Sequence, residues 1–251
     1  KILKMYKNIP KTELIYKKNK PIDHLSSAEA ISVMVQEQKD ASREVKKAAT
    51  SIEDAIEAIH KKLLKNPNGR LVYVGAGTSA RIGVQDGAEL FPTFNWPKSR
   101  LDFIIAGGYT AIFNAVENAE DDVLEAKKST SKKSINSKDV VIGLAASGNT
   151  PFTCKVLEQS NKKGALTIAI SNNPKGEILN FGQYQIILNT REEVISGSTR
   201  LKAGTAQKIC LNIISSMVMV KMGRVQNGIM SHMIPTNEKL RQRKSRINRK
   251  L

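Results

Sequence analysis

Two stretches of the chain share one order of features: an apolar run, a glycine-containing turn with hydroxyl side chains, and the start of a helical pattern. In the first, Leu71-Val72-Tyr73-Val74 leads into the turn 75–79, and in the second, residues 139–144 lead into the turn 145–151. Short apolar runs of this kind are typical of strands buried in a parallel sheet. A turn that opens a helix directs backbone N–H groups toward an anion. The pair therefore predicts an α/β fold with an anion site at the strand ends.

Three further apolar runs extend the pattern along the chain. They lie at 101–106, 165–171 and 184–188, with helical periodicity between them. Before the first unit, apolar residues three or four positions apart mark one face of a helix over 41–64, and the helical pattern already begins at Ser26. This alternation predicts a three-layer α-β-α domain with a mostly parallel sheet, preceded by an N-terminal helical segment.

The first turn also fits the loose dinucleotide-binding pattern Gly75-x-Gly77-x-x-Ala80. A dinucleotide-binding fold also needs an acidic residue at the end of its second strand to hold the ribose hydroxyls. The nearest candidate here, Asp102, lies at the start of its strand instead. No Gly-Lys-Ser/Thr ending makes a nucleotide P-loop either. The two turns do carry four hydroxyl side chains, and all four can donate to one phosphate. They belong to Thr78, Ser79, Ser147 and Thr150. They favour a phosphomonoester, such as a sugar phosphate.

The net charge of +17 is concentrated at the two ends of the chain. Residues 1–20 carry seven lysines against one glutamate, and residues 238–251 carry seven Lys or Arg against one glutamate. A nucleic-acid-binding face is expected to lie within the fold. The charge pattern therefore predicts a solvated basic arm over 1–24, of which residues 1–20 are dispensable for turnover, a basic tail over 238–251, and no nucleic-acid partner.

The composition excludes several other classes of protein. Two cysteines, Cys154 and Cys210, exclude a disulfide scaffold, and neither they nor the histidines have metal-ligand spacing. The best candidate for a membrane span, 209–222, is short and interrupted by polar residues. The lysine-rich start has no apolar segment behind it, as a secretory signal would. These features predict a cytoplasmic protein with no membrane partner.

Three further stretches make the set of motifs recognisable. They are Ala106-Gly107-Gly108, the segment Ala115-Val116-Glu117-Asn118-Ala119-Glu120-Asp121-Asp122, and the long block 197–208. Together with the two turns, they resemble the sugar isomerase (SIS) fold and, within it, the N-acetylmuramic acid 6-phosphate etherase family, which is related to the glucokinase regulatory protein. The resemblance extends from about Ile22 to Ile247 and implies an SIS domain over 25–237.

The resemblance implies a lyase that converts N-acetylmuramic acid 6-phosphate into N-acetylglucosamine 6-phosphate and D-lactate, in the recycling of cell-wall amino sugars. In the ring-opened sugar, a base removes the C2 proton beside the aldehyde, the lactyl oxygen leaves C3 with a proton from an acid, and water adds back. Two carboxyl groups in different environments suit these roles, and no metal or redox cofactor is implied. The alternative is a non-catalytic sugar-phosphate sensor on the same fold.

By the same resemblance, Glu120 is the C2 base and Glu89 is the acid for the lactyl oxygen. Glu117, one helical turn before Glu120, is a fallback for the base. Each could instead be an ordinary solvated glutamate, but the presence of both acids favours the enzyme over the sensor. The expected phosphate and substrate ligands are Gly77, Thr78, Ser79, Ser147, Asn149, Thr150, Ser198, Arg200 and Lys202. A simpler role for Ser198 or Thr199 is to cap a helix N-terminus.

The chain departs from the family pattern at Ala80, where glycine is usual, at Asn149, where arginine is usual, and at Leu90-Phe91-Pro92, where Cys-Pro-Pro is usual. The missing arginine is expected to weaken substrate contacts rather than the chemistry. Many members continue beyond Ile247 into a helical segment that is missing here. The broadly apolar helix expected at about 202–222 suggests burial between subunits, and the resemblance implies a homodimer with sites near the interface.

Overall fold

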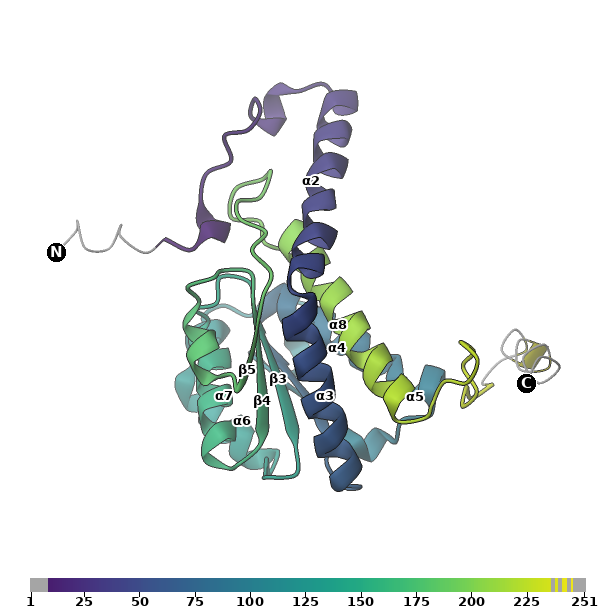
Figure 1. Cartoon of the computed structure of the whole chain (residues 1–251). Coiled ribbons are helices and arrows are strands. Elements are labelled where there is room, and N and C mark those ends of the chain that lie inside the picture. The colour runs from purple at the N-terminus through teal and green to yellow at the C-terminus, as the bar shows by residue number, and fades with distance from the viewer. Residues whose placement is uncertain (1–8, 236–237, 239–240, 243–244, 246–251) are drawn as a thin grey trace.

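The computed structural model describes residues 9–235, 238, 241–242 and 245, so most of the expected basic tail lies outside the described residues. Five parallel strands form one sheet in the order β2-β1-β3-β4-β5 (Figure 1). They are β1 (Leu71–Gly75), β2 (Leu101–Ile105), β3 (Val140–Ala145), β4 (Leu166–Ser171) and β5 (Tyr184–Ile187). The prediction of a mostly parallel sheet is confirmed.

Helices connect the strands and lie on both faces of the sheet (Figure 1). The α-helices are α2 (Ser27–Lys47), α3 (Ala49–Lys65), α4 (Gly77–Ala88), α5 (Leu90–Phe94), α6 (Val123–Lys132), α7 (Pro151–Lys162) and α8 (Lys202–Lys221). Short 3₁₀ turns include η2 (Lys11–Glu13), η3 (Ile22–His24), η4 (Lys98–Arg100), η5 (Tyr109–Ile112), η6 (Ala119–Asp121) and η7 (Glu177–Phe181).

The helix expected over 41–64 is in fact split between α2 and α3 by a break at Ala48. Helix α2 begins where the pattern predicts, because Ser26 and Glu29 form a reciprocal capping box. The two helices have different surroundings: α3 covers the sheet, whereas α2 extends beyond it and contacts α8 (Figure 1). The apolar stripe continues across the break, and its members are all buried: Val45, Ala48, Ile52, Ile56, Ile59 and Leu63.

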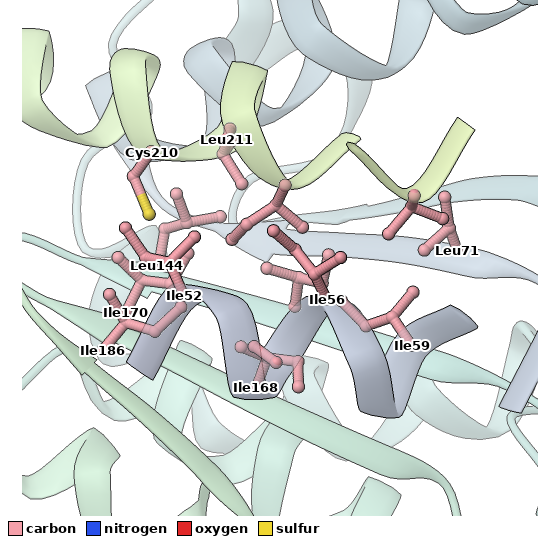
Figure 2. Close-up of a cluster of buried hydrophobic side chains, with 14 of the residues drawn as sticks. Ile52, Ile56, Ile59, Leu71, Leu144, Ile168, Ile170, Ile186, Cys210 and Leu211 are labelled. Atoms are coloured by element: carbon pink, nitrogen blue, oxygen red, sulfur yellow. The ribbon is translucent and has the colours of Figure 1, made fainter. Parts of the chain in front are cut away.

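Alternating side chains of the strands build a core on each face of the sheet. Leu71 and Tyr73 of β1 join α3 and α8 on one face, while Val72 and Val74 join α6 and α7 on the other. Figure 2 shows the first core, in which isoleucines of α3 and Cys210 and Leu211 of α8 gather over the strands. Burial on both faces explains why the strand sequences are apolar runs rather than alternating ones.

Helix α8 has the length and composition of a membrane span, with 20 residues and a mean hydropathy of 1.2. The sequence-based argument from shortness and interruption therefore does not hold for the whole helix. However, 56% of the apolar 18-residue stretch of α8 is buried inside the domain, where α8 contacts α2, α3 and α4. The core that α8 builds accounts for most of its apolar side chains, while Ile213, Met217 and Val220 stay exposed.

The strand order places the two glycine turns side by side. After β1 the chain moves to β2 on one side, and after β3 it moves to β4 and β5 on the other. Neighbouring strands that send the chain in opposite directions leave a crevice at their carboxyl ends, where α/β proteins commonly bind ligands. Because β1 and β3 are these neighbours, both turns open onto the crevice.

Candidate active site

A pocket of about 470 Å³ lies over the carboxyl ends of β1 and β3. It brings together Glu120 and six of the expected ligands, which are Gly77, Thr78, Ser79, Ser147, Asn149 and Thr150. Its remaining lining residues are Pro10, Glu13, Ala76, Ala146, Gly197 and Thr199. Segments that are far apart in the sequence thus converge on one cavity.

Two helices begin at this pocket. The residues before α4 and α7, Ala76 and Thr150, make no side-chain cap, so the first backbone N–H groups of both helices remain available. Pro151 occupies the first turn of α7, as predicted, where its missing N–H costs no hydrogen bond. Helix N-termini carry partial positive charge, and two of them beside four hydroxyl side chains make a strong site for an anion.

The charges around the pocket are unusual for an anion site. None of the described residues that line it is Lys or Arg, and two of them, Glu13 and Glu120, are carboxylates. A bound phosphate would therefore rely on hydroxyls and backbone N–H groups at the turns. The carboxylates are available to the uncharged remainder of a ligand.

The second turn is held in place by the segment that follows β4. Asn173 donates from Nδ2 to the carbonyl of Ser147 at 3.0 Å, and the backbone N–H of Ile178 donates to the carbonyl of Gly148 at 2.8 Å. Asn149 accepts the backbone N–H of Glu177 on its Oδ1 at 3.0 Å. Asn149 therefore braces this turn.

The first turn is tied instead to the segment that carries Glu120. Arg81 of α4 donates from Nε to the carbonyl of Ile112 at 2.9 Å and from Nη2 to that of Ala111 at 3.0 Å. An adjoining cavity of about 330 Å³ is lined by Thr78, Arg81, Glu117 and Glu120, among others. Asn118 adopts a left-handed conformation (φ 57°), which asparagine tolerates, at the turn that leads to Glu120.

Glu89 is not brought to either cavity within one chain. It is exposed and follows α4, whose first residues lie at the pocket. With a rise of 1.5 Å per residue, the eleven positions between Thr78 and Glu89 span about 16 Å. Glu89 and Glu120 of the same chain therefore lie at opposite ends of α4 and do not face one another across the pocket.

Lys202 lies in the interior rather than in the pocket. Its side chain is fully buried, and Nζ donates to Oε2 of Glu37 at 2.6 Å. Burial raises the pKa of Glu37, but the bonds from Lys202 and Lys18 outweigh it, so the net shift is downward. The structure thus gives Lys202 a contact with α2, and Arg200, which is exposed, also lies outside the pocket lining.

The alternative role of Ser198 or Thr199 as a helix cap is wrong. The residue at the cap position of α8 is Leu201, and its side chain makes no cap bond. Glu193 supplies the acceptors, since its carboxylate accepts the backbone N–H groups of Lys202 and Ala203 at 3.1 and 2.8 Å. Ser198 lies outside the pocket, while its neighbours Gly197 and Thr199 line it.

The described part of the N-terminal arm does not stand free in solvent, contrary to the sequence-based expectation. Thr12 is fully buried, and Pro10 and Glu13 line the pocket. The backbone N–H of Tyr16 donates to Oγ of Ser196 at 3.0 Å. The polar composition of the arm gives no signal for these contacts, because they are made to residues distant in the sequence.

Comparison with known proteins agrees with this geometry. The chain matches the SIS domain family over residues 115–217 and the N-terminal SIS domain of the glucokinase regulatory protein over 51–161. It is 42% identical over 237 residues to the N-acetylmuramic acid 6-phosphate etherase of Deinococcus radiodurans, covering 94% of this chain and 77% of that protein. It is 44% identical over 236 residues to that of Lactobacillus johnsonii, covering 94% and 78%. The chain belongs to the N-acetylmuramic acid 6-phosphate etherase family.

Solved structures similar to this etherase-family chain share its fold. One is a phosphosugar isomerase assigned to capsule formation in Bacteroides fragilis, with a TM-score of 0.60, 16% identity, and coverage of 81% of this chain and 95% of that one. Another is a phosphoheptose isomerase from Francisella tularensis, with a TM-score of 0.58, 19% identity, and coverage of 77% and 98%. The expected SIS fold is confirmed.

Two departures from the etherase family pattern have structural counterparts. Leu90 is buried in the core in which Trp96 also lies. Ala80 is buried in the first turn of α4, and its backbone approaches Gly75 so closely that a Cβ on that glycine would lie 2.9 Å from the nitrogen of Ala80.

Among the described residues, no three His, Cys, Asp or Glu side chains gather as metal ligands.

Proposed function

We propose that this chain is an etherase that cleaves the D-lactyl ether of N-acetylmuramic acid 6-phosphate, releasing N-acetylglucosamine 6-phosphate and D-lactate. The observation that carries this proposal is the pocket in which two helix N-termini meet Glu120, in a chain 42% identical to a curated etherase. The alternative, a sensor without catalysis, would require the phosphate site but gives no role to a carboxylate beside it.

The phosphate binds at the two turns in this proposal. Hydroxyls of Thr78, Ser79, Ser147 and Thr150 and the first N–H groups of α4 and α7 donate to its oxygens. Hydrogen bonds to a charged acceptor contribute about 1.5–3 kcal/mol each. With the phosphate fixed there, the sugar chain extends along the cavity toward Glu120.

Glu120 then removes the proton from C2 of the ring-opened sugar. The electron pair forms the C2–C3 double bond, and the lactyl oxygen leaves C3 with a proton from a second carboxyl group. Water adds to C3 of the unsaturated aldehyde, and a proton returns to C2, so that the same two groups act in reverse. Glu117, which lines the adjoining cavity, remains the fallback for the base.

The second carboxyl group in this proposal is Glu89 of another copy of the chain. Within one chain it lies at the far end of α4, so it can serve a pocket only across a subunit interface. Exposed apolar side chains on α8 support a homodimer, because Ile213, Met217 and Val220 recur at steps of four and three residues along one face. Ile31 and Val35 of α2 are exposed with the same spacing.

We place the enzyme in the cytoplasm, where a phosphorylated sugar is retained because its charge opposes transfer through a bilayer. The binding roles proposed for Ser198 and Arg200 would also be fulfilled in the dimer or not at all, since neither lines the pocket of its own chain. Lys202 is fully buried against Glu37, so its side chain does not reach a second subunit. Substitution of Ser198 or Arg200 tests the interface more directly than the phosphate site.

The decisive experiment is to incubate the purified protein with N-acetylmuramic acid 6-phosphate and to assay D-lactate. Glu120→Gln is expected to reduce lactate release by about a hundred- to ten-thousand-fold and to abolish deuterium exchange at C2. Glu89→Gln is expected to suppress lactate release while leaving slow C2 exchange. The opposite pattern would reverse the two roles, and no lactate from the unmodified protein would favour the sensor.

Mixing the two variants tests the shared site. If each site combines Glu120 of one subunit with Glu89 of the other, random exchange of subunits rebuilds about a quarter of the sites, because a mixed dimer has one intact and one doubly substituted site. Lactate release should then rise well above that of either variant alone. Absence of this recovery in subunits shown to exchange would mean that the two glutamates do not act across an interface.

A further inference from the structure

The segment 10–16 contributes Pro10 and Glu13 to the lining of the pocket. After Pro10, the 3₁₀ turn η2 (Lys11–Glu13) is closed by the backbone N–H of Glu13, which donates to the carbonyl of Pro10 at 2.9 Å. Thr12, in the middle of the turn, is fully buried. The turn therefore has a fixed inner side, and the next residue, Glu13, is held at the pocket lining.

Contacts to two other elements hold this segment in place. The backbone N–H of Tyr16 bonds to Ser196, and its hydroxyl donates to Oε1 of Glu37 on α2 at 3.1 Å. Lys18 donates to both carboxylate oxygens of Glu37 at 3.1 Å. Since Glu37 is also bonded by the buried Lys202, the segment is anchored to a network that reaches α8.

Glu13 has a carboxylate that the fold does not use. No described residue donates a hydrogen bond to it or forms an ion pair with it within bonding distance. Gly197, where the backbone has a φ of 77°, lies beside it: a Cβ at Gly197 would be 3.5 Å from Oε2 of Glu13. That distance is an ordinary van der Waals contact, so the carboxylate lies next to Gly197 at the edge of the pocket.

The charge of Glu13 decides which part of a ligand it can serve. A carboxylate repels a phosphate, and no Lys or Arg among the described lining residues offsets that repulsion. Carboxylate oxygens do accept hydrogen bonds from hydroxyl groups, and such bonds are stronger than neutral ones. The open chain of a sugar phosphate carries several hydroxyls beyond the phosphate.

We propose that Glu13 is a specificity-determining residue whose carboxylate accepts hydrogen bonds from the hydroxyl groups of the sugar while the two turns hold the phosphate. This inference rests on the proposed function for the nature of the sugar. It makes the N-terminal segment part of the binding site and reverses the expectation that residues 1–20 are dispensable. A ligand consisting of phosphate alone gains nothing from Glu13.

The test compares two ligands by calorimetry: N-acetylglucosamine 6-phosphate and inorganic phosphate. Glu13→Ala is expected to weaken binding of the sugar phosphate by about ten- to a hundredfold, the range that a lost hydrogen bond to a charged group produces. Affinity for inorganic phosphate should stay the same or rise. Glu13→Gln, which keeps an acceptor of the same size, should recover part of the loss.

Glu53→Ala, an exposed carboxylate of α3 outside the pocket lining, is the matched control and should leave both affinities unchanged. Equal weakening of both ligands by Glu13→Ala would show that the segment only shapes the pocket, and unchanged binding of both would show no contact; either result overturns the inference. Thermal unfolding of each variant separates binding from folding. Because the readout is binding, a lack of lactate release would defeat the proposed function and leave the Glu13 result to be judged separately.

Discussion

The two glycine turns look alike in sequence but differ in their surroundings. Gly77 and Gly148 both have positive φ, 52° and 78°. A Cβ on Gly148 would lie 2.4 Å from Cα of Gly176 and 2.6 Å from Oγ of Ser171, whereas a Cβ on Gly77 would meet nothing within 4 Å. The second turn is thus enclosed by the chain around it, while the first is open to the crevice.

Their hydrogen bonds differ in the same sense. The second turn is bonded to residues 173–178, which belong to the sheet's own framework after β4. The first turn is bonded through Arg81 to residues 111 and 112, on the segment that leads to Glu120. The comparison teaches that the second turn is fixed by its surroundings, whereas the first is joined to the segment that carries the proposed base.

The largest expected difference comes from adding a methyl group to each glycine. Gly148→Ala combines backbone strain with a clash against backbone atoms and should lower the free energy of unfolding by about 2–6 kcal/mol. Gly77→Ala causes no clash, so only the strain of a left-handed backbone at alanine should lower the free energy of unfolding, by about 1–2 kcal/mol. Urea unfolding of both variants measures the difference. Equal losses of stability in the two variants would contradict the conclusion that the second turn is enclosed and the first is open.

A smaller effect is expected where the first turn meets the segment 111–120, which carries the proposed base Glu120. Arg81→Met keeps much of the side-chain length but removes the bonds to the carbonyls of Ala111 and Ile112, so Glu120 should lose its alignment with the bound sugar. We expect kcat to fall about ten- to a hundredfold, as small misplacements of reacting groups do, with a modest change in KM. If KM rises while kcat is unchanged, Arg81 serves binding instead.

The smallest effect concerns the second turn and the family's usual residue. Asn149→Arg places a cation beside a pocket whose described lining has none, and a charge-assisted bond to phosphate is worth about 1.5–3 kcal/mol. The substitution also removes the bond from the backbone N–H of Glu177, a loss of about 1 kcal/mol. Inorganic phosphate should therefore bind about three- to thirtyfold more tightly by calorimetry. Weaker binding would mean that bracing the turn matters more than added charge.

The sequence predicts the parts of the molecule that depend on local pattern. The strands, Ser26 at the start of α2 and Pro151 at the start of α7 follow from apolar periodicity and capping preferences of neighbouring residues. The resemblance predicts the family, and the six pocket residues in the turns follow from their position after β1 and β3. These features need no knowledge of distant contacts.

Features that depend on tertiary contacts could not be predicted in this way. Glu193 accepts the N–H groups at the start of α8 from nine residues upstream, a spacing that no capping pattern includes. Thr12 and Glu13 sit in a polar, lysine-rich stretch whose composition indicates solvent. Glu89 is exposed because α4 ends there, and Lys202 is buried because α8 packs against α2. The residue types alone do not reveal either arrangement.

The bond between Glu37 and Lys202 joins residues 165 positions apart, and it has a consequence for synthesis of the chain on the ribosome. All five strands leave the ribosome before α8 does, so the nascent sheet has α3 but lacks the helix that completes its core. Contacts of such long sequence separation slow folding and leave apolar surface exposed in partly made chains. We therefore expect the domain to close only after release of α8, and truncated chains that end before residue 202 to need a chaperone or to aggregate.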